Sequence, residues 1–411
     1  MLRQSGGNWV AGNRFFGRVA ELGSLQERVN QRRHTLLTAQ RRMGKTSLIR
    51  ELLRRLDARG DYAPIFVDLE GTRTPEDAIA EIGVRCRGLR STWQNLLHRF
   101  GGLSDQVEEL GVSDLRIRLR TVVNSQNWMK RGDQLFEILA AGSKPAVLAI
   151  DELALMVAGM LNGGEFASTP TRKNAAGQFL SWLRKNGQEH RDRVSIIISG
   201  SIGLQPLLEQ AGLSSLVSIF SPLKLEAWTA DEARSCLKEL AATDGISLPQ
   251  PVLDDICRRL RCCVPHHVQE FYFHIFEELQ RTGTPVATAE HVERIYRGEM
   301  LGMSGQAALH HYEARLASAL GPERYWIARE LLTEAAINGG KIDIDSITAF
   351  KSLLKLDPIG AEESVRQVLR VLEHDGYLAY QDGEYRYVSG LLEDWWRKSH
   401  GRSSGPSRGR S

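Results

Sequence analysis

Runs of consecutive apolar residues mark short buried strands in the first half of the chain. Segments with apolar residues at helical spacing separate these runs, and the clearest is the leucine-rich stripe within residues 46–56. Unalternated apolar strands separated by helices are typical of a parallel sheet that is covered on both faces. We therefore expect an α/β core, with strands over residues 35–38, 63–69, 146–150 and 194–198 and a fifth within 216–225.

After residue 228 the pattern changes to helices alone. Periodic apolar positions recur in residues 230–242, 251–260 and 268–279, and helical segments continue through 289–318. No strand pattern interrupts this stretch, so we expect a separate all-helical segment that packs its apolar stripes together.

The region 319–399 shows a third pattern. A helix over 361–374 is followed by two short aromatic-rich segments that flank Asp382-Gly383. An Asp-Gly pair between alternating segments is typical of a tight β-hairpin. Helices followed by a hairpin is the order of elements in a winged helix.

These changes of pattern divide the chain into five segments. We expect a flexible N-terminus at 1–13, an α/β core at 14–228, a helical lid at 229–318, a winged-helix domain at 319–399 and a disordered basic tail at 400–411.

The strongest chemical motif follows the first strand. Residues 39–46 read AQRRMGKT and fit the pattern GxxxxGK[ST], with Ala39 in place of the first glycine. Such a loop turns its backbone N–H groups towards phosphate, and the following helix N-terminus adds a positive dipole end. Lys45 is expected to reach the β- and γ-phosphates, and the Thr46 hydroxyl to hold Mg²⁺. The expected nucleotide contacts are Ala39, Gln40, Arg41, Arg42, Met43, Gly44, Lys45, Thr46 and Ser47.

A carboxylate pair completes this pattern at the end of the third strand. Asp151 is expected to hold the Mg²⁺ shell through water, and Glu152 to polarise the attacking water. Ser199-Gly200-Ser201 follows the fourth strand, where Ser201 or Ser199 would touch the γ-phosphate or the water; a simple turn is the alternative. The predicted cofactors are ATP and Mg²⁺, and the predicted catalytic residues are Lys45, Glu152 and Ser201.

Composition and charge narrow the class of protein. The 411 residues are 42% hydrophobic and 25% charged, which is typical of a globular chain, and the net charge of +3 gives no sign of a nucleic-acid coat protein. Residues 1–60 nevertheless carry a net charge of +9, which suits phosphate ligands. The N-terminus lacks a signal-peptide pattern, and the longest apolar run, 153–161, is too short to cross a bilayer. We expect a cytoplasmic protein with no membrane partner.

Together these motifs resemble a known group. The sequence FFGR at 15–18, the loop QRRMGKTSL, and IDE and ISGS after the third and fourth strands are similar to bacterial and archaeal P-loop ATPases related to AAA+ origin-recognition proteins, near the STAND branch. The resemblance extends over about residues 13–399, since LEHDGYL, YRYVS and DWW are similar to the winged-helix ends of that group. It implies a P-loop NTPase core with a helical lid and a C-terminal winged helix. It also implies that the segment ending at Arg18 packs near the adenine.

Two departures from the group bear on activity. AAA+ rings use an arginine finger before the last core strand, yet no arginine lies between Arg193 and Arg234. The lid arginine is also missing, because the matching segment reads CVPHH at 263–267. We expect slow hydrolysis and no finger-dependent hexamer. Arg41 or Arg42 could act in cis, and a surface role for them is the alternative.

The target of the winged helix is open at this stage. The helix 361–374 carries three Glu and two Arg, and the wing carries Asp382, Glu384 and Arg386, so neither offers a clear surface for phosphates. Double-stranded DNA and a protein partner are both kept as candidates. The predicted function is an ATP-hydrolysing switch, with a STAND-like signalling or scaffold ATPase of little turnover as the alternative.

Overall fold

The computed structural model describes residues 2–3, 9–100, 111–162 and 170–401, and the expected basic tail lies almost wholly outside them. The chain forms two compact units. The first comprises Trp9–Thr38 and Lys45–Leu225. The second includes the segment Ala39–Gly44 and the chain from Glu226 onward.

A five-stranded parallel sheet forms the centre of the first unit, as the sequence pattern predicts. All residues of β3 and β4 are buried, because helices cover both of their faces. The strand order is β2-β3-β4-β1-β5, with each neighbouring pair parallel. The strands are β1 (Thr35–Thr38), β2 (Ala63–Asp68), β3 (Ala146–Asp151), β4 (Val194–Ser199) and β5 (Ser221–Lys224).

Only part of the fifth expected strand is extended. Residues Ser214–Val217 form a 3₁₀ turn, and the strand begins at Ser221. Gly212 ends the preceding helix with a φ of 65°, and the following serines favour turns. The apolar residues of this segment therefore do not form one continuous strand.

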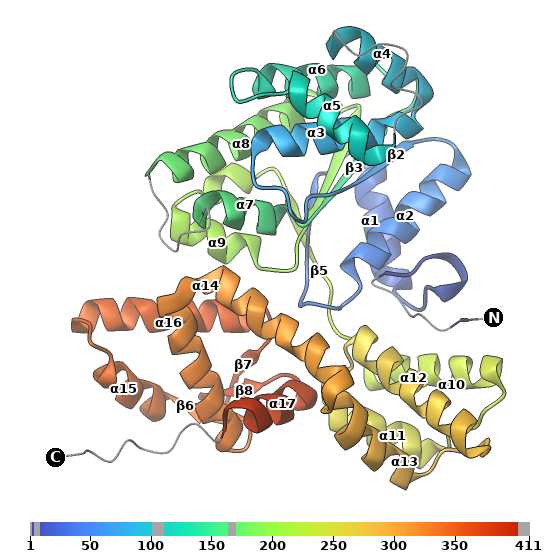
Figure 1. The fold of residues 1–411 in the computed structure, drawn as a ribbon, viewed down its shortest axis with the longest axis vertical. Helices are drawn as coiled ribbons and strands as arrows, with labels where there is room; N and C mark the ends of the chain where they lie inside the picture. Colours follow the sequence, from blue (N-terminus) through green and yellow to red (C-terminus); the bar gives the residue numbers. More distant parts are fainter. Residues whose placement is uncertain (1, 4–8, 101–110, 163–169, 402–411) are drawn as a thin grey trace. The chain divides into compact units, whose positions relative to one another are not determined.

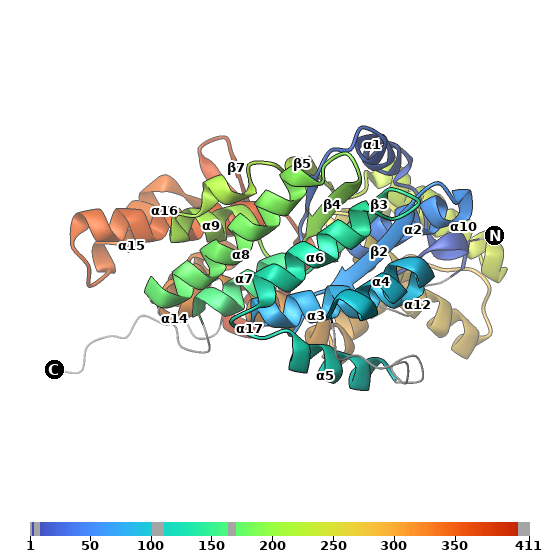
Figure 2. The same ribbon diagram turned by 90° about the horizontal axis from the view of Figure 1, so that it is seen from above.

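Helices lie on both sides of this sheet. Figures 1 and 2 show α1 and α2 on one side, and α6, α7 and α8 on the other. The helix α3 packs on β2 and on α5. The helices of this unit are α1 (Val19–Asn30), α2 (Lys45–Arg59), α3 (Pro75–Arg85), α4 (Arg90–Phe100), α5 (Val112–Val122), α6 (Trp128–Ala140), α7 (Leu153–Asn162), α8 (Pro170–Glu189) and α9 (Leu204–Ala211).

Aromatic rings fill the space between α6 and α8. Trp182 meets Trp128, Phe136 and Phe179 with ring centroids 5.5–5.7 Å apart. A Cβ added at Gly132 would lie 2.4 Å from the Trp182 ring, so only glycine fits there. The indole N–H of Trp182 donates to Asp133 at 3.0 Å, which satisfies its one polar group.

The second unit opens with a bundle of four helices. The first of them starts at a capping box, in which Thr229 and Glu232 satisfy each other's backbone N–H groups. The helices are α10 (Ala230–Asp244), α11 (Gln250–Leu260), α12 (Pro265–Thr282) and α13 (Ala289–Ile295).

The chain then runs through the long helix α14 into the C-terminal elements. Gly321 interrupts α14 with a φ of 72°, so two helices meet there. A three-stranded antiparallel sheet of order β6-β8-β7 follows, and it fits a winged-helix-like region. The elements are α14 (Met303–Ile337), β6 (Lys341–Asp343), α15 (Ile344–Leu353), α16 (Pro358–His374), β7 (Leu378–Gln381), β8 (Glu384–Tyr387) and α17 (Gly390–His400).

The hairpin expected at the C-terminal end is confirmed. Asp382 and Gly383 have φ values of 52° and 85°, the left-handed pair that a two-residue hairpin turn requires. The strand β6 was not expected, because three residues are too few to show an alternating pattern. Among the described residues, no helix has both the length and the apolar character needed to cross a membrane.

Candidate functional site

Polar residues gather at one edge of the parallel sheet. The strands β3, β4 and β1 are consecutive neighbours, so their carboxyl ends meet at the same edge. Asp151 ends β3, Ser199 ends β4, and Lys45 opens the helix that follows β1 and its loop. Carboxyl ends of parallel strands are the usual place for a ligand in an open α/β sheet.

Asp151 is held by two hydroxyl groups. Thr46 Oγ1 donates to its Oδ2 and Ser199 Oγ donates to its Oδ1, each at 2.5 Å. The side chain is 4% exposed, so both hydrogen bonds act in a largely dry environment. The structure thus brings together Thr46 and Asp151, the two residues expected at the metal, and adds Ser199 as the group that orients the carboxylate.

Glu152 is held in turn by Ser201. Its Oε2 accepts from the Ser201 backbone N–H and from Oγ, both at 2.9 Å. Burial, and next the charge of Asp151, raise the pKa of Glu152, whereas Ser201 and Lys45 oppose the rise. Its backbone takes a φ of 58°, which is uncommon for a residue with a side chain and is typical of a functional position.

The N-terminal segment of the chain makes hydrogen bonds to the first half of α2. Lys45 and Ser47 are both buried. Ser47 Oγ accepts from the Val10 backbone N–H at 3.0 Å, and Gly12 N–H donates to Glu51 at 2.8 Å. The segment around residues 10–12 therefore lies along α2.

The loop residues 39–44 belong to the second unit and contact its helices. Arg42 and Gly44 have φ values of 63° and 90°, and such left-handed residues turn successive N–H groups into an anion-binding concavity. Met43 is buried. Arg42 bonds to His266 and the Arg41 carbonyl accepts from Tyr312. The expected contacts of residues 39–47 with nucleotide stay predictions.

Arg18 lies just before α1. It is 6% exposed and its Nη1 donates to Glu21 Oε1 at 2.7 Å. Its φ of 58° places it at the N-cap in a left-handed conformation. The expectation that this segment packs near adenine stays a prediction.

Arg50 is a cation near this site that no sequence motif marks. Arg50 of α2 lies between the rings of Trp9 and Phe66, with its guanidinium carbon 4.0 Å from each centroid. Burial lowers its pKa, and the charges of Asp151 and Asp68 oppose that effect. In the sequence Arg50 is one of several arginines on an amphipathic helix, and only the fold sets it apart.

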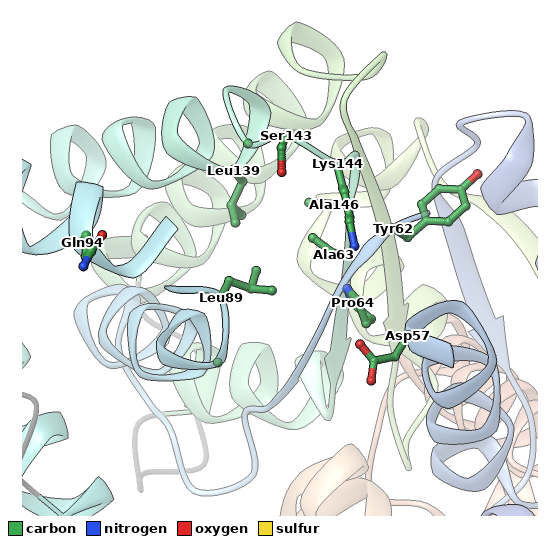
Figure 3. Close-up of a pocket in the computed structure, with 12 residues that line it drawn as sticks. Asp57, Tyr62, Ala63, Pro64, Leu89, Gln94, Leu139, Ser143, Lys144 and Ala146 are labelled. Carbon is green, nitrogen blue, oxygen red and sulfur yellow. The ribbon is translucent and has the colours of Figure 1, made fainter. Parts of the chain in front are cut away.

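A hollow of about 450 Å³ opens at the other edge of the sheet. Ala63 and Ala146, the first residues of β2 and β3, are among the residues that line it. Figure 3 shows Leu89 and Leu139 on one side of it and Tyr62 and Asp57 on the other. Because the hollow is at the amino ends of the strands, it is separate from the Asp151 site.

The donor set at Asp151 fits Mg²⁺. A hydroxyl and a carboxylate lie side by side, and both are the hard oxygen ligands that this ion prefers. In the part of the chain that the structure describes, no three His, Cys, Asp or Glu side chains gather as a metal cage. An Mg²⁺ ion here would need phosphate oxygens and water as its other ligands.

Comparisons with known proteins agree with this geometry. Residues 28–208 match the model of a family described as an AAA domain. A Walker-type ATPase of Pyrococcus abyssi has a similar structure, with a TM-score of 0.60 and 16% identity over 96% of this chain and 99% of that one. The fold is that of an AAA+-related P-loop ATPase. A search of curated proteins found no match.

A second similar structure covers nearly the whole chain. The ORC2 protein of Aeropyrum pernix, in ADPNP–ADP complexes, has a TM-score of 0.56 and 13% identity over 95% of this chain and 96% of that one. Its ADP form has a TM-score of 0.52 with the same identity and coverage. Both the core and the C-terminal elements of this chain therefore have counterparts in one solved structure.

Proposed function

We propose that the protein binds ATP with Mg²⁺ at the carboxyl edge of the sheet and hydrolyses it slowly to ADP and phosphate, as a nucleotide-dependent switch. The observation that carries this proposal is the pair of hydrogen-bonded groups at that edge. Thr46 and Ser199 hold Asp151, and Ser201 holds Glu152 beside it. The ADPNP–ADP complexes of the similar ORC2 protein support nucleotide as the ligand.

Each residue of this edge has a role in the proposal. The loop N–H groups and Lys45 bind the β- and γ-phosphates, because both are donors that lie at the start of a helix. The Thr46 hydroxyl and Asp151 hold Mg²⁺, which when bound neutralises charge on the phosphate oxygens. Ser199 positions the Asp151 carboxylate.

Glu152 is the residue we assign to the attacking water. Ser201 occupies Oε2, so Oε1 is the atom that accepts a hydrogen bond and then the proton from water. Ser201 also opposes the rise in the pKa of Glu152, and so helps to keep the carboxylate charged. The side chain of Ser201 acts on the water through Glu152.

Slow turnover follows from the missing cations. No arginine occurs between Arg193 and Arg234 to act as a finger, and His266-His267 stand where the lid arginine is expected. Burial, and next the charge of Arg42, lower the pKa of His266 to about 2, so that this side chain is neutral at physiological pH. A neutral imidazole stabilises a developing phosphate charge less than a guanidinium does.

We propose a protein rather than DNA as the target of the winged-helix-like region. Leu353, Leu356 and Ile359 are exposed apolar residues between and around α15 and α16. Four basic side chains nearby are paired with acids, which leaves less charge for phosphates. These pairs are Lys351–Glu362, Arg366–Glu363, Lys341–Glu384 and Arg386–Glu384. We also propose three domains: an α/β core at 14–228, a helical lid at 229–318 and a winged-helix domain at 319–399.

Phosphate release from ATP, with and without duplex DNA, tests the function. We expect a low rate that depends on Mg²⁺, is unchanged by DNA and disappears in Glu152→Gln, which keeps the size of the side chain but cannot accept the proton. Nucleotide binding should survive in that variant. Stimulation by DNA that weakens as salt is raised would make DNA the target instead. Equal release by Glu152→Gln and wild type would remove Glu152 from its role.

A further inference from the structure

Three consecutive loop residues are each held by a different element of the second unit. Gln40 lies against the turn that follows α16. The Arg41 carbonyl accepts a hydrogen bond from α14, and the Arg42 side chain donates one to the start of α12. These elements are far apart in the sequence. A contact of this kind reaches well beyond the loop's own neighbours in the chain.

The contact with α14 is made through the backbone of the loop. Tyr312 Oη donates to the Arg41 carbonyl at 3.3 Å. The Tyr312 carbonyl accepts in turn from Tyr377 Oη at 2.8 Å. Both tyrosines are buried, so the Arg41 carbonyl is joined to the winged-helix-like region by two buried hydroxyl groups.

The contact with α12 is made through a side chain. Arg42 Nη1 donates to His266 Nε2 at 2.6 Å. The next residue, His267, is fully buried and its ring lies 6.0 Å from that of Tyr312. The Arg42 side chain is therefore held within the second unit, against the first turn of α12.

The third contact depends on a glycine. Gly376 has a φ of 75°, and a Cβ added there would lie 1.7 Å from Gln40 Nε2. Any side chain at this position would displace Gln40. The loop and the turn are thus packed as closely as backbone and side chain allow.

These contacts bear on the shape that binds phosphate. Arg42 is in the left-handed region, where a residue with a side chain is disfavoured unless its surroundings hold it. We propose that His266 and Tyr312 are positioning residues that hold Arg42 and the loop in the phosphate-binding conformation. The inference rests on the proposed function and adds a regulation to it. Because coupling is reciprocal, nucleotide on the loop also stabilises these contacts of the second unit.

A double-mutant cycle between positions 42 and 266 tests the proposal. His266→Ala should weaken Mg²⁺–ADP binding by roughly five- to thirtyfold, the equilibrium equivalent of one disfavoured left-handed residue. In an Arg42→Gly background the same change should have no effect, because glycine adopts this conformation without support. His274→Ala, on the same helix and away from the loop, is the matched control. Titration calorimetry measures the affinity for Mg²⁺–ADP of five proteins: wild type, the three single variants and the Arg42→Gly/His266→Ala double variant.

Two outcomes would overturn the inference. One is that His266→Ala binds ADP as wild type does. The other is that it weakens binding equally in the wild-type and Arg42→Gly backgrounds, which would show general damage to the lid.

A second measurement needs no nucleotide. Trypsin cleaves after arginine, so cleavage at Arg41 and Arg42 reports how firmly the loop is held. We expect faster cleavage in His266→Ala and in Tyr312→Phe than in wild type or His274→Ala. Gly376→Ala should also speed cleavage, whereas Gly383→Ala, with a similar φ and nothing near its Cβ, should not. If wild type binds no ADP, the proposed function fails; unchanged cleavage in these variants refutes the contact itself.

Discussion

At the scale of single residues, the site depends on hydroxyl groups that fix carboxylates. Ser199 and Thr46 each hold one oxygen of Asp151, and Ser201 holds one oxygen of Glu152. A buried carboxylate without such donors would be strongly disfavoured, so these short polar side chains make the acidic pair possible. The function of the edge therefore depends on residues that carry no charge.

Lys45 gives the most direct test of the phosphate site. Lys45→Ala should weaken ATP binding by roughly a hundredfold or more, because a charge-assisted hydrogen bond to phosphate is lost. Lys144→Ala, in the hollow at the other edge of the sheet, should bind ATP as wild type does. Fluorescent-nucleotide titration measures the affinity of both variants. Equal affinities would show that the nucleotide does not bind at the loop.

Glu51 links residue chemistry to stability. Although burial raises its pKa, hydrogen bonds from Arg54, the Gly12 N–H and Arg55 lower it to about 2. A carboxylate whose pKa is lower in the folded state stabilises the fold fully at pH values above its pKa in the unfolded state. That stabilisation is lost as the pH falls through the folded-state pKa. Glu51→Gln should therefore be less stable than wild type at pH 7, and the gap should narrow between about pH 5 and pH 2. Urea unfolding at several pH values measures the gap, and a constant gap would contradict the assignment.

At the scale of elements, close packing rather than propensity decides several positions. Gly132 lies in the interior of α6, where glycine is a poor helix former, yet the Trp182 ring occupies the space that a Cβ would need. Gly23 lies in the interior of α1 with nothing within 4 Å of such a Cβ. The two glycines look alike in the sequence and differ only in their surroundings.

These two glycines should respond oppositely to the same change. Gly132→Ala should lower the free energy of unfolding by about 1–3 kcal/mol through overpacking. Gly23→Ala should raise it by about 0.5–1 kcal/mol, since alanine is the better helix former. Chemical denaturation measures the free energy of unfolding of both variants. If both were destabilised, the space around Gly23 would be occupied and the reasoning would be wrong.

At the scale of the whole molecule, the second unit joins the helical bundle to the winged-helix-like region. Glu393 of α17 is 3% exposed and accepts from Arg261 and Arg397, both at 2.7 Å. Tyr296 donates to Asp394 at 2.7 Å, next along α17. These contacts should make the bundle and the C-terminal elements unfold together.

Hydrogen exchange tests this coupling. Glu393→Gln should reduce protection in both α11 and α17, by about 1–3 kcal/mol, because a buried acceptor of two guanidinium groups is replaced. The strands β3 and β4 should keep their protection. Glu384→Gln, at a more exposed pair, should cost no more than about 1 kcal/mol. Loss of protection in α17 alone would show that the two parts open independently.

Much of the fold could be predicted from local patterns. The buried strands, the helices with apolar stripes and the Asp382-Gly383 hairpin follow from the periodicity of side chains and from turn chemistry, which act over a few residues. The motif at 39–46 and the acidic pair at the end of β3 are local patterns too, and their role in binding nucleotide stays a prediction. The short strand β6 was not, because it depends on pairing with β8, more than forty residues further along the chain.

Residue type and local spacing are thus enough to predict the elements and the chemical groups of this protein. Only the packing of distant segments shows which serine holds which carboxylate, why Gly376 faces Gln40, and that His266 and Tyr312 contact the loop 39–44. These are contacts between residues distant in the chain. They depend on how whole elements pack, and no local pattern of side chains encodes that packing.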